Sequence, residues 1–430
     1  MFYIYYLIMS LTTMRRVSKT LRPWLNTKTG TSLDFNIKSA NGSYIYDKNN
    51  NPIIDFTSGL MVTNLGHNNK YINNHIKSAL KTGLTYFPPS VLTTERERLS
   101  ERLVDLSLEG GKVFYTNGGA DANEAAIYFA KHHFRKTPTK SRILRFNKSF
   151  HGGSTYVSSL LGGDTRRQEK ESHFSFELTT DAILPNPSMS DNGKSSMDEI
   201  EYIIEHQHAD IAAILIEGSS GTAGCYVYPK GYYTKLEAVV KKHDILLIVD
   251  EVMSGCGRTG KMFAHQHEGG NPDIITLAKG ITNGCVPMGA TIVSERISDG
   301  FKNDSVNNGL TYSGHPLACA AANACLDLYD NNLFNKVTEH GKTLARQLNY
   351  MALSYPDLIK DSRGSGMLHC VEFYDNHVSH IHNFLLKKGV YTFFRDNNLY
   401  IAPPLTITAC ELHTTLDTID QVCMLENSQL

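Results

Sequence analysis

Six short apolar segments of strand length recur between residues 113 and 293, separated by stretches with helical periodicity. A strand that is apolar at almost every position must be covered on both faces, as in a parallel sheet between two layers of helices. The sequence therefore predicts an α/β fold built on a mostly parallel sheet. The six segments are 113–115, 142–144, 211–216, 245–249, 274–277 and 290–293.

The two ends of the chain carry other patterns. Residues 43–56 alternate apolar and polar positions around turn formers, which predicts a β-hairpin, and an alanine-rich helical pattern begins after Leu317. A chain of 430 residues exceeds what one core usually supports. We expect a large domain at 76–310, a smaller α+β domain built from 21–75 and 311–430, and an N-terminal extension at 1–20.

The charge balance and the cysteines limit the possible partners. The 42 Lys and Arg residues against 43 Asp and Glu leave a formal net charge of −1, so we expect no nucleic-acid partner. The eight cysteines form no C-x-x-C pair and no Cys/His ligand spacing. This pattern suits a reducing compartment, and we expect no metal site.

The apolar stretch at residues 2–11 is too short to span a bilayer, which needs about 20 residues in a helix. Positive charges follow this stretch, whereas in a signal peptide they precede it. We expect no membrane association and a cytoplasmic location, with a mitochondrial location as the alternative.

Lys279 closes the apolar segment 274–278 and is followed at once by Gly280. A lysine at the end of a buried strand is poorly hydrated, and burial lowers the pKa of an amine and makes it nucleophilic. Taken alone, Lys279 also fits a solvated loop lysine, because lysines are rarely fully buried without a partner.

Two other strand ends carry chemically suitable residues. Asp250 ends the segment 245–249, where it could bind a protonated ring nitrogen or cap the next helix. Residues 116–127 place two glycines at a strand-to-helix turn, where backbone N–H groups can bind a phosphate, although the same pattern also makes a simple connection. Lys279 follows Asp250 by 29 residues, so the two side chains could emerge from neighbouring strands.

An anion cradle, a strand-end acid and a strand-end lysine together match the needs of pyridoxal 5'-phosphate. The motifs are YTNGGADANEA at 115–125, SFHGG at 149–153, VDEVMSG at 249–255, LAKG at 277–280, GLTYSGHP at 309–316 and IAPPL at 401–405. With these motifs in register from about Trp24 onward, the sequence resembles the class III, omega-type aminotransferases of fold type I. The resemblance implies a seven-stranded sheet in the large domain.

The resemblance also implies the role of each residue. Lys279 would form the Schiff base with the cofactor and then act as general base and acid, and Asp250 would pair with the ring nitrogen. The remaining cofactor contacts would come from Val252 and Phe150 on the two ring faces, His151 near the ring, the backbone of Gly119 and Ala120 at the phosphate, and Thr311 at the phosphate of a neighbouring subunit. The last role implies a homodimer with shared sites, or a tetramer.

The substrate side departs from the ornithine and 4-aminobutyrate branch of the family. That branch has glutamate and glutamine where this chain has Thr222 and Met253, so these positions favour the amine, β-alanine and taurine branches. Arg395, eight residues before Pro403, is the candidate for gripping an acidic substrate group, since a guanidinium can bind a carboxylate or sulfonate bidentately. Trp24 is the second substrate-binding candidate.

The expected function is transfer of an amino group from an omega-amino acid or amine, such as β-alanine or taurine, to pyruvate or another 2-oxo acid. The expected mechanism is ping-pong. The alternatives are a 4-aminobutyrate or ornithine-type aminotransferase, an aminomutase, racemase or decarboxylase on the same fold, and a non-catalytic protein that keeps the fold.

Overall fold

The computed structural model describes residues 36–154, 157, 183–187, 191–375 and 377–430. Residues 1–36 form one unit and residues 37–430 another, and the elements below belong to the second unit. Trp24 and the expected extension at 1–20 lie outside the described residues. The domain boundaries expected from the sequence stay a prediction.

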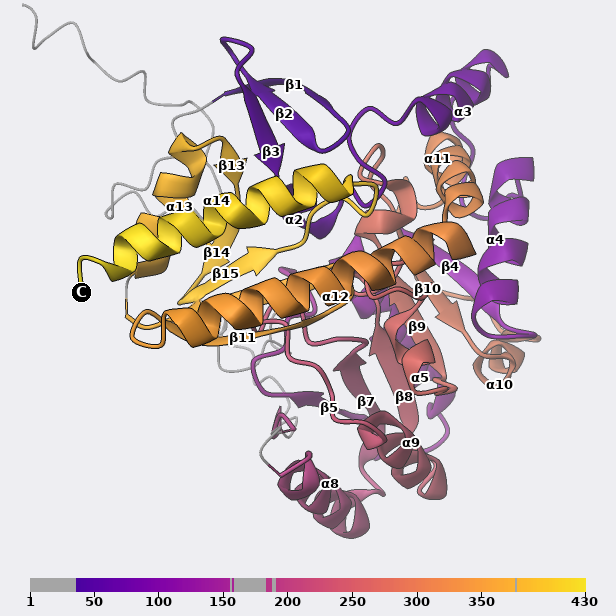
Figure 1. Cartoon of the computed structure of the whole chain (residues 1–430). Helices are drawn as coiled ribbons and strands as arrows, with labels where there is room; N and C mark the ends of the chain where they lie inside the picture. Colours follow the sequence, from indigo (N-terminus) through magenta and orange to yellow (C-terminus); the bar gives the residue numbers. More distant parts are fainter. Residues whose placement is uncertain (1–35, 155–156, 158–182, 188–190, 376) are drawn as a thin grey trace, which may run out of the picture. The chain divides into compact units, whose positions relative to one another are not determined.

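A seven-stranded sheet with the order β4-β10-β9-β8-β7-β5-β6 occupies residues 112–293 (Figure 1). The pairs β5–β6, β5–β7, β7–β8 and β8–β9 are parallel, and β10 is antiparallel to β4 and β9. The mostly parallel sheet and its six apolar strands are confirmed. The seventh strand, β6, has only two residues, which is too short to give a periodic pattern in the sequence. The strands are β4 (Lys112–Thr116), β5 (Arg142–Phe146), β6 (Ile183–Leu184), β7 (Ile211–Glu217), β8 (Leu246–Asp250), β9 (Ile274–Leu277) and β10 (Gly289–Val293).

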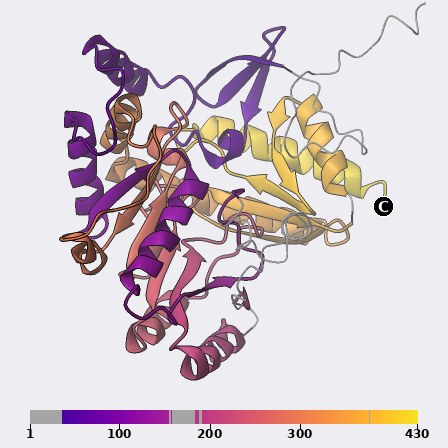
Figure 2. The same ribbon diagram turned by 180° about the vertical axis from the view of Figure 1, so that it is seen from behind.

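Each face of this sheet is covered by its own helices, as the opposite views of Figure 1 and Figure 2 show. Alternate strand residues point to opposite faces. On one face, Leu215, Ile248 and Ile274 pack in a single cluster with α5 (Gly119–His133). On the other face, Ile216 and Val249 pack with α8 (Lys194–Gln207) and α9 (Tyr232–Lys242). Coverage on both faces explains why the strands are apolar at nearly every position.

Strands from both chain ends share a second sheet, with the order β1-β2-β3-β13. The predicted hairpin is confirmed, because β2 pairs antiparallel with β3. Strand β13 pairs parallel with β3 and so joins the C-terminal part of the chain to the hairpin. The strands are β1 (Ile37–Asn41), β2 (Tyr44–Asp47), β3 (Pro52–Asp55) and β13 (Val390–Tyr391).

A third sheet, of order β11-β12-β15-β14, carries the C-terminal strands β11 (Ile359–Ser365), β12 (Leu368–Phe373), β14 (Phe393–Arg395) and β15 (Asn398–Ile401). Helices α12 (Asn331–Ser354) and α13 (His377–Lys387) pack against these strands, and α14 (Ala409–Asn427) packs against both helices. Helix α14 starts with a capping box in which Thr408 and Glu411 bond each other's backbone N–H groups, which satisfies two otherwise unpaired donors.

The alanine-rich pattern forms α11 (Pro316–Leu328), as expected, and this helix packs against α3 (Lys70–Lys81) and α4 (Thr94–Leu106). Short turns complete the described elements: α2 (Ser58–Met61), η1 (Ala264–His267), η2 (Lys279–Thr282), α10 (Glu295–Ser298) and η3 (Asp299–Phe301). None of the helices in the described part of the chain is long and apolar enough to cross a membrane.

Arg258 joins segments that are distant in sequence. Its fully buried guanidinium donates from Nη1 to the carbonyls of Pro403 at 2.6 Å and Met367 at 3.2 Å, and from Nη2 to Asn64 Oδ1 at 2.5 Å and Ser58 Oγ at 3.3 Å. Burial lowers the pKa of Arg258 to about 10, so the side chain stays charged at neutral pH. The loop after β8 is thereby tied to both ends of the chain.

We expect Arg258→Met to lower the free energy of unfolding by about 3 kcal/mol or more, because buried carbonyls lose their donor at about 1–3 kcal/mol each. The control is Arg98→Met, since Arg98 is half exposed and lies 3.8 Å from its acidic partner. This control should change stability by about 0.5 kcal/mol or less. Urea unfolding followed by circular dichroism measures both, and equal midpoints for the two variants would contradict the role of Arg258.

Candidate active site

Lys279 is positioned by the end of β9. All four strand residues are buried, and the chain then turns with Lys279 in the left-handed conformation, at φ 51°. Gly280 packs so tightly that a Cβ there would lie 2.5 Å from Asn64 Nδ2 and 2.8 Å from Cys256 Cβ. A glycine is therefore required after the lysine to bring this turn against its neighbours.

The surroundings of Lys279 make its amine more easily deprotonated. Burial lowers the pKa of Lys279 to about 8, Arg258 acts in the same direction, and the carboxyl groups of Asp250 and Glu217 oppose the shift. The side chain keeps partial exposure at this position. A neutral amine that can be reached from outside is the form needed for attack on a carbonyl carbon.

Asp250 ends β8, the strand beside β9, so the acid and the lysine emerge from neighbouring strands as the sequence predicts. Its buried carboxylate accepts three contacts: Oδ1 accepts from the Val252 N–H at 2.9 Å, and Oδ2 lies 2.7 Å from Asn123 Nδ2 and 2.9 Å from His151 Nδ1. Hydrogen bonds donated to a carboxylate favour its charged form. The acid is thus fixed in one orientation.

Glu217 lies next to Asp250 as its partner in the adjacent strand β7. The carboxyl group is buried, and Ser220 Oγ donates to its Oε2 at 3.4 Å. Burial and the neighbouring carboxylate of Asp250 raise the pKa of Glu217 well above its usual range. The surroundings therefore favour the neutral form of Glu217.

The turn between β4 and α5 forms the anion cradle. Helix α5 begins at Gly119, and its N-cap residue Gly118 has no side chain to bond the first N–H groups of the helix. Gly119 packs against Val252 and Ala278: a Cβ on Gly119 would lie 2.8 Å from Val252 Cγ1 and 3.5 Å from Ala278 Cβ. The cradle, Val252 and the residue before Lys279 are therefore in contact.

The turn after β5 brings Phe150 and His151 to the same place. His151 is buried with Nδ1 on Asp250, and its carbonyl accepts from Asn123 Nδ2 at 2.8 Å. In the described part of the chain, His151 Nε2 is buried and has no hydrogen-bond partner. Phe150 is partly exposed beside it.

Comparison with known proteins places this geometry in a family. Residues 26–423 match the family model of class III aminotransferases. The chain is 34% identical to the mitochondrial acetylornithine aminotransferase of Candida glabrata, over 79% of this chain and 78% of that one. The chain belongs to the class III aminotransferases. It is also 32% identical to probable gamma-aminobutyrate transaminase 4 of Oryza sativa subsp. japonica, over 87% of this chain and 84% of that one.

The similarity extends to three-dimensional structure. The taurine:2-oxoglutarate aminotransferase from Bifidobacterium kashiwanohense, solved in complex with PLP and glutamate, has a TM-score of 0.87 and 32% identity, over 95% of this chain and 96% of that one. The protein is therefore a fold type I aminotransferase that uses pyridoxal 5'-phosphate.

The residues of this aminotransferase fit that cofactor. Gly119, Ala120, Phe150, Val252 and Lys279 are each partly exposed although buried residues surround them, as expected for the lining of a ligand site. The α5 N-terminus can bind a phosphate, the carboxylate of Asp250 suits a protonated ring nitrogen, and Lys279 provides the amine. The individual roles stay predictions.

The remaining expected site residues are Thr311, Arg395 and Trp24. Thr311 is exposed, and its carbonyl accepts a hydrogen bond from Tyr86 Oη at 2.9 Å. Arg395 ends β14, where its Nε lies 3.9 Å from Asp396 Oδ2. Trp24 lies outside the described residues. Thr311 therefore has no hydrogen bond to the Lys279 cluster within the described part of one chain.

Sequence reasoning missed Asn123 and Glu217. Glu217 had a usable signal, since it ends an apolar strand as Asp250 does. Asn123 had none, because a single asparagine in a helical stretch does not show that it faces a strand-end acid across the layer.

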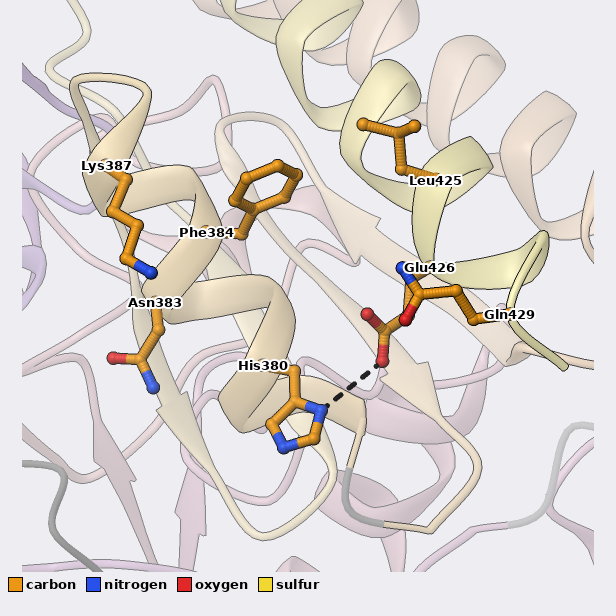
Figure 3. A pocket seen from close by; sticks show the side chains of 7 residues that line it. All are labelled: His380, Asn383, Phe384, Lys387, Leu425, Glu426 and Gln429. Atoms are coloured by element: carbon orange, nitrogen blue, oxygen red, sulfur yellow. Dashed lines mark ion pairs between the residues drawn. The ribbon is translucent and has the colours of Figure 1, made fainter.

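A pocket elsewhere in this aminotransferase is separate from the cluster. It lies between α13 and α14 and is lined by His380, Asn383, Phe384, Lys387, Leu425, Glu426 and Gln429 (Figure 3). Glu426 Oε1 lies 3.6 Å from His380 Nδ1 and 2.9 Å from His377 Nδ1. None of the expected site residues lines this pocket.

We expect Lys279 in the cofactor-free enzyme to react with an acylating reagent with a midpoint near pH 8, because only the neutral amine reacts and its population grows as the pH rises through the pKa. The control is the exposed Lys302, whose pKa is raised by its hydrogen bond to Asp299. Competitive labelling with mass spectrometry measures both lysines. A midpoint for Lys279 above pH 10 would contradict the assigned environment.

Proposed function

We propose that this aminotransferase takes its amino group from an omega-amino acid or amine, such as β-alanine or taurine, and gives it to pyruvate or another 2-oxo acid. The supporting observation is the apolar wall beside Val252, which consists of Met61, Cys225, Met253, Leu368, Cys370, Tyr400 and Ala402, with Leu60 and Phe393 packed against it. Arg395 lies close enough to Tyr400 of this wall to act on it electrostatically. Because a charged group needs a partner when buried, the acidic group of β-alanine or taurine would bind outside the wall, with Arg395 as the candidate.

Thr222 supports the same proposal. Its carbonyl accepts from Tyr400 Oη at 2.8 Å, which fixes Tyr400 in the wall, and its own hydroxyl is neutral. The related taurine:2-oxoglutarate aminotransferase carries a substrate of the proposed kind in its name.

Each residue of the Lys279 cluster would have one role in the reaction. The cofactor supplies an electrophilic carbonyl and an electron-accepting ring. Lys279 would accept the proton from the carbon that bears the donor nitrogen and return it to the cofactor carbon on the other side of that nitrogen, as its lowered pKa permits. Asp250 would hold a proton at the ring nitrogen, and the first N–H groups of α5 would bind the phosphate.

A second candidate is an acetylornithine or 4-aminobutyrate aminotransferase. The names of two relatives at 34% and 32% identity favour it. An aminomutase, racemase or decarboxylase on the same fold is the remaining alternative, and it would not leave the amino group on the cofactor.

The deciding experiment is a half-reaction screen of the purified enzyme with its cofactor. β-Alanine, taurine, 4-aminobutyrate, N-acetylornithine, ornithine and simple amines are added singly, and cofactor absorption is recorded without any oxo acid. We expect β-alanine, taurine or a simple amine to convert the cofactor to its amino form fastest. Preference for N-acetylornithine would establish the second candidate, and wild-type turnover by Lys279→Ala would refute the mechanism.

We expect Arg395→Ala to raise the KM of an acidic donor about 10- to 100-fold, because a charged hydrogen bond to the substrate contributes about 1.5–3 kcal/mol. Arg395 is partly buried and lies close enough to Tyr400 in the wall to act on it electrostatically. A simple amine should be unaffected, as should the control Arg346→Ala on the exposed side of α12. Steady-state kinetics measures both donors, and equal losses for them would contradict the assignment.

We also propose a homodimer. Exposed apolar side chains gather on residues 84–92 and 306–312, here called the apolar patch: Leu84, Phe87, Val91, Leu92, Val306, Leu310 and Tyr312. The two segments adjoin, since Tyr86 bonds Thr311 and its ring lies 6.1 Å from that of Tyr312. Contiguous apolar surface of this kind marks association sites. Thr311 lies within the patch, where it would face a second copy.

We expect Leu92→Arg to shift the protein toward monomers and to lower activity about 10-fold or more, because a charge would be buried in the interface and Thr311 would lose its partner site. The matched control is Leu353→Arg, which changes a leucine 74% exposed, against 68% for Leu92, but on α12 outside the patch. Sedimentation velocity and activity measure both. A fully active wild-type monomer would contradict the proposal.

For the compartment, we propose the cytoplasm, with the mitochondrion as the alternative. All eight cysteines lie in the described residues and are free thiols, as is usual in reducing compartments.

A further inference from the structure

A row of three polar side chains lies at the carboxyl edge of the sheet. Glu217, Asp250 and Thr276 are consecutive Cα partners in the parallel strands β7, β8 and β9. Partners in parallel strands project to the same face. This is the face that α5 covers, since Leu215, Ile248 and Ile274, two residues before each of them, pack with that helix.

Asn123 is the α5 residue that contacts this row. It is 1% exposed, and its amide makes three hydrogen bonds. Nδ2 donates to Asp250 Oδ2 at 2.7 Å and to the His151 carbonyl at 2.8 Å, and Oδ1 accepts from Thr276 Oγ1 at 2.8 Å. The amide therefore links the acid to both of its neighbours.

Chemistry fixes which way the amide faces. An ionised carboxylate and a backbone carbonyl can only accept, so Nδ2 must point toward Asp250 and His151. The hydroxyl of Thr276 then donates to Oδ1 on the opposite side. If that donor were lost, Oδ1 would lack this hydrogen bond, while the carboxylate and the His151 carbonyl would still require Nδ2 on their side.

Packing alone does not call for a polar group at position 123. The neighbouring helix residues Ala122, Ala125 and Ala126 are buried and apolar, and burying an amide is costly unless it is hydrogen-bonded. An apolar side chain of similar volume would fill the same space. The hydrogen bonds of the amide therefore explain why position 123 carries an asparagine.

We propose that Asn123 is a positioning residue for the transamination reaction: its amide holds the Asp250 carboxylate in the orientation that faces the protonated ring nitrogen of the cofactor, and Thr276 fixes the amide. The inference rests on the proposed role of Asp250. Asn123 Nδ2 and His151 Nδ1 both contact Oδ2 of Asp250, so the amide and the imidazole hold the carboxylate from two sides.

The first test compares Asn123→Leu with Asn123→Asp. The titratable groups around position 123 are Asp250 from β8, His151 from the turn after β5, Glu217 from β7 and Lys279 after β9. N123L cannot donate at any pH, and its kcat/KM should fall about 10- to 100-fold between pH 6 and 9. N123D can donate only while protonated, so it should be within about 3-fold of wild type at pH 6 and about 10-fold or more impaired at pH 9.

The second readout is independent of turnover. The enzyme is loaded with cofactor labelled with ¹⁵N in the ring, and NMR follows the protonation of that nitrogen with pH. In N123L the nitrogen should lose its proton at least one pH unit below wild type, which is a 10-fold change in the protonation equilibrium. T276V should give a smaller shift in the same direction.

The matched control is Thr291→Val. Thr291 is a buried threonine that also donates to α5, to the Ala122 carbonyl at 2.8 Å, but has no hydrogen bond to Asp250 among the described residues. If the Asn123 variants behave like T291V and the ring nitrogen loses its proton in D250N, the proposed role of Asn123 is wrong and that of Asp250 is not affected. A ring nitrogen that stays protonated in D250N would instead overturn the proposed role of Asp250. If N123L fails to fold, N123D and T276V still decide the question.

Discussion

Parallel pairing of β7, β8 and β9 places the carboxyl groups of Glu217 and Asp250 side by side in a buried position. Two neighbouring carboxylates cannot both ionise there without a large cost. The structure resolves this with donors: Asp250 receives Val252 N–H, Asn123 and His151, whereas Glu217 receives Ser220. Asp250 thus receives three donors and Glu217 one, and burial together with the neighbouring Asp250 raises the pKa of Glu217 well above its usual range.

The pKa of Lys279 depends on these neighbouring groups. Burial lowers its pKa to about 8, Arg258 acts in the same direction, and the carboxyl groups of Asp250 and Glu217 oppose the shift. The left-handed backbone of Lys279 and the close approach of Gly280 to Asn64 and Cys256 hold the amine in this field. The left-handed backbone conformation and the neighbouring charged groups therefore both act on the Lys279 amine.

The sequence predicted the sheet well because strand burial on both faces leaves a direct signal in apolar runs. It also predicted Lys279 and Asp250, which stand at the ends of those runs. It could not predict Asn123, whose contacts with Asp250, His151 and Thr276 cross from a helix to the sheet and depend on how the two layers dock. Arg258 was equally hidden, since its partners come from residues 58–64, 367 and 403. Local patterns report burial and strand ends, whereas these contacts are set by tertiary packing.

The residues proposed for the chemistry and those proposed for substrate choice belong to different parts of the structure. The charged row, the cradle and Lys279 belong to the central sheet and α5, where a change in one side chain disturbs several hydrogen bonds. The apolar wall instead combines Met61 from the N-terminal part, Met253 after β8 and Tyr400 from the C-terminal sheet. Its members contact one another mainly through apolar packing, which tolerates replacement at similar volume. On the proposed role of the wall, donor preference would change there while Asp250 and its donors stay intact, which suits a family in which acetylornithine, 4-aminobutyrate and taurine appear in the names of relatives.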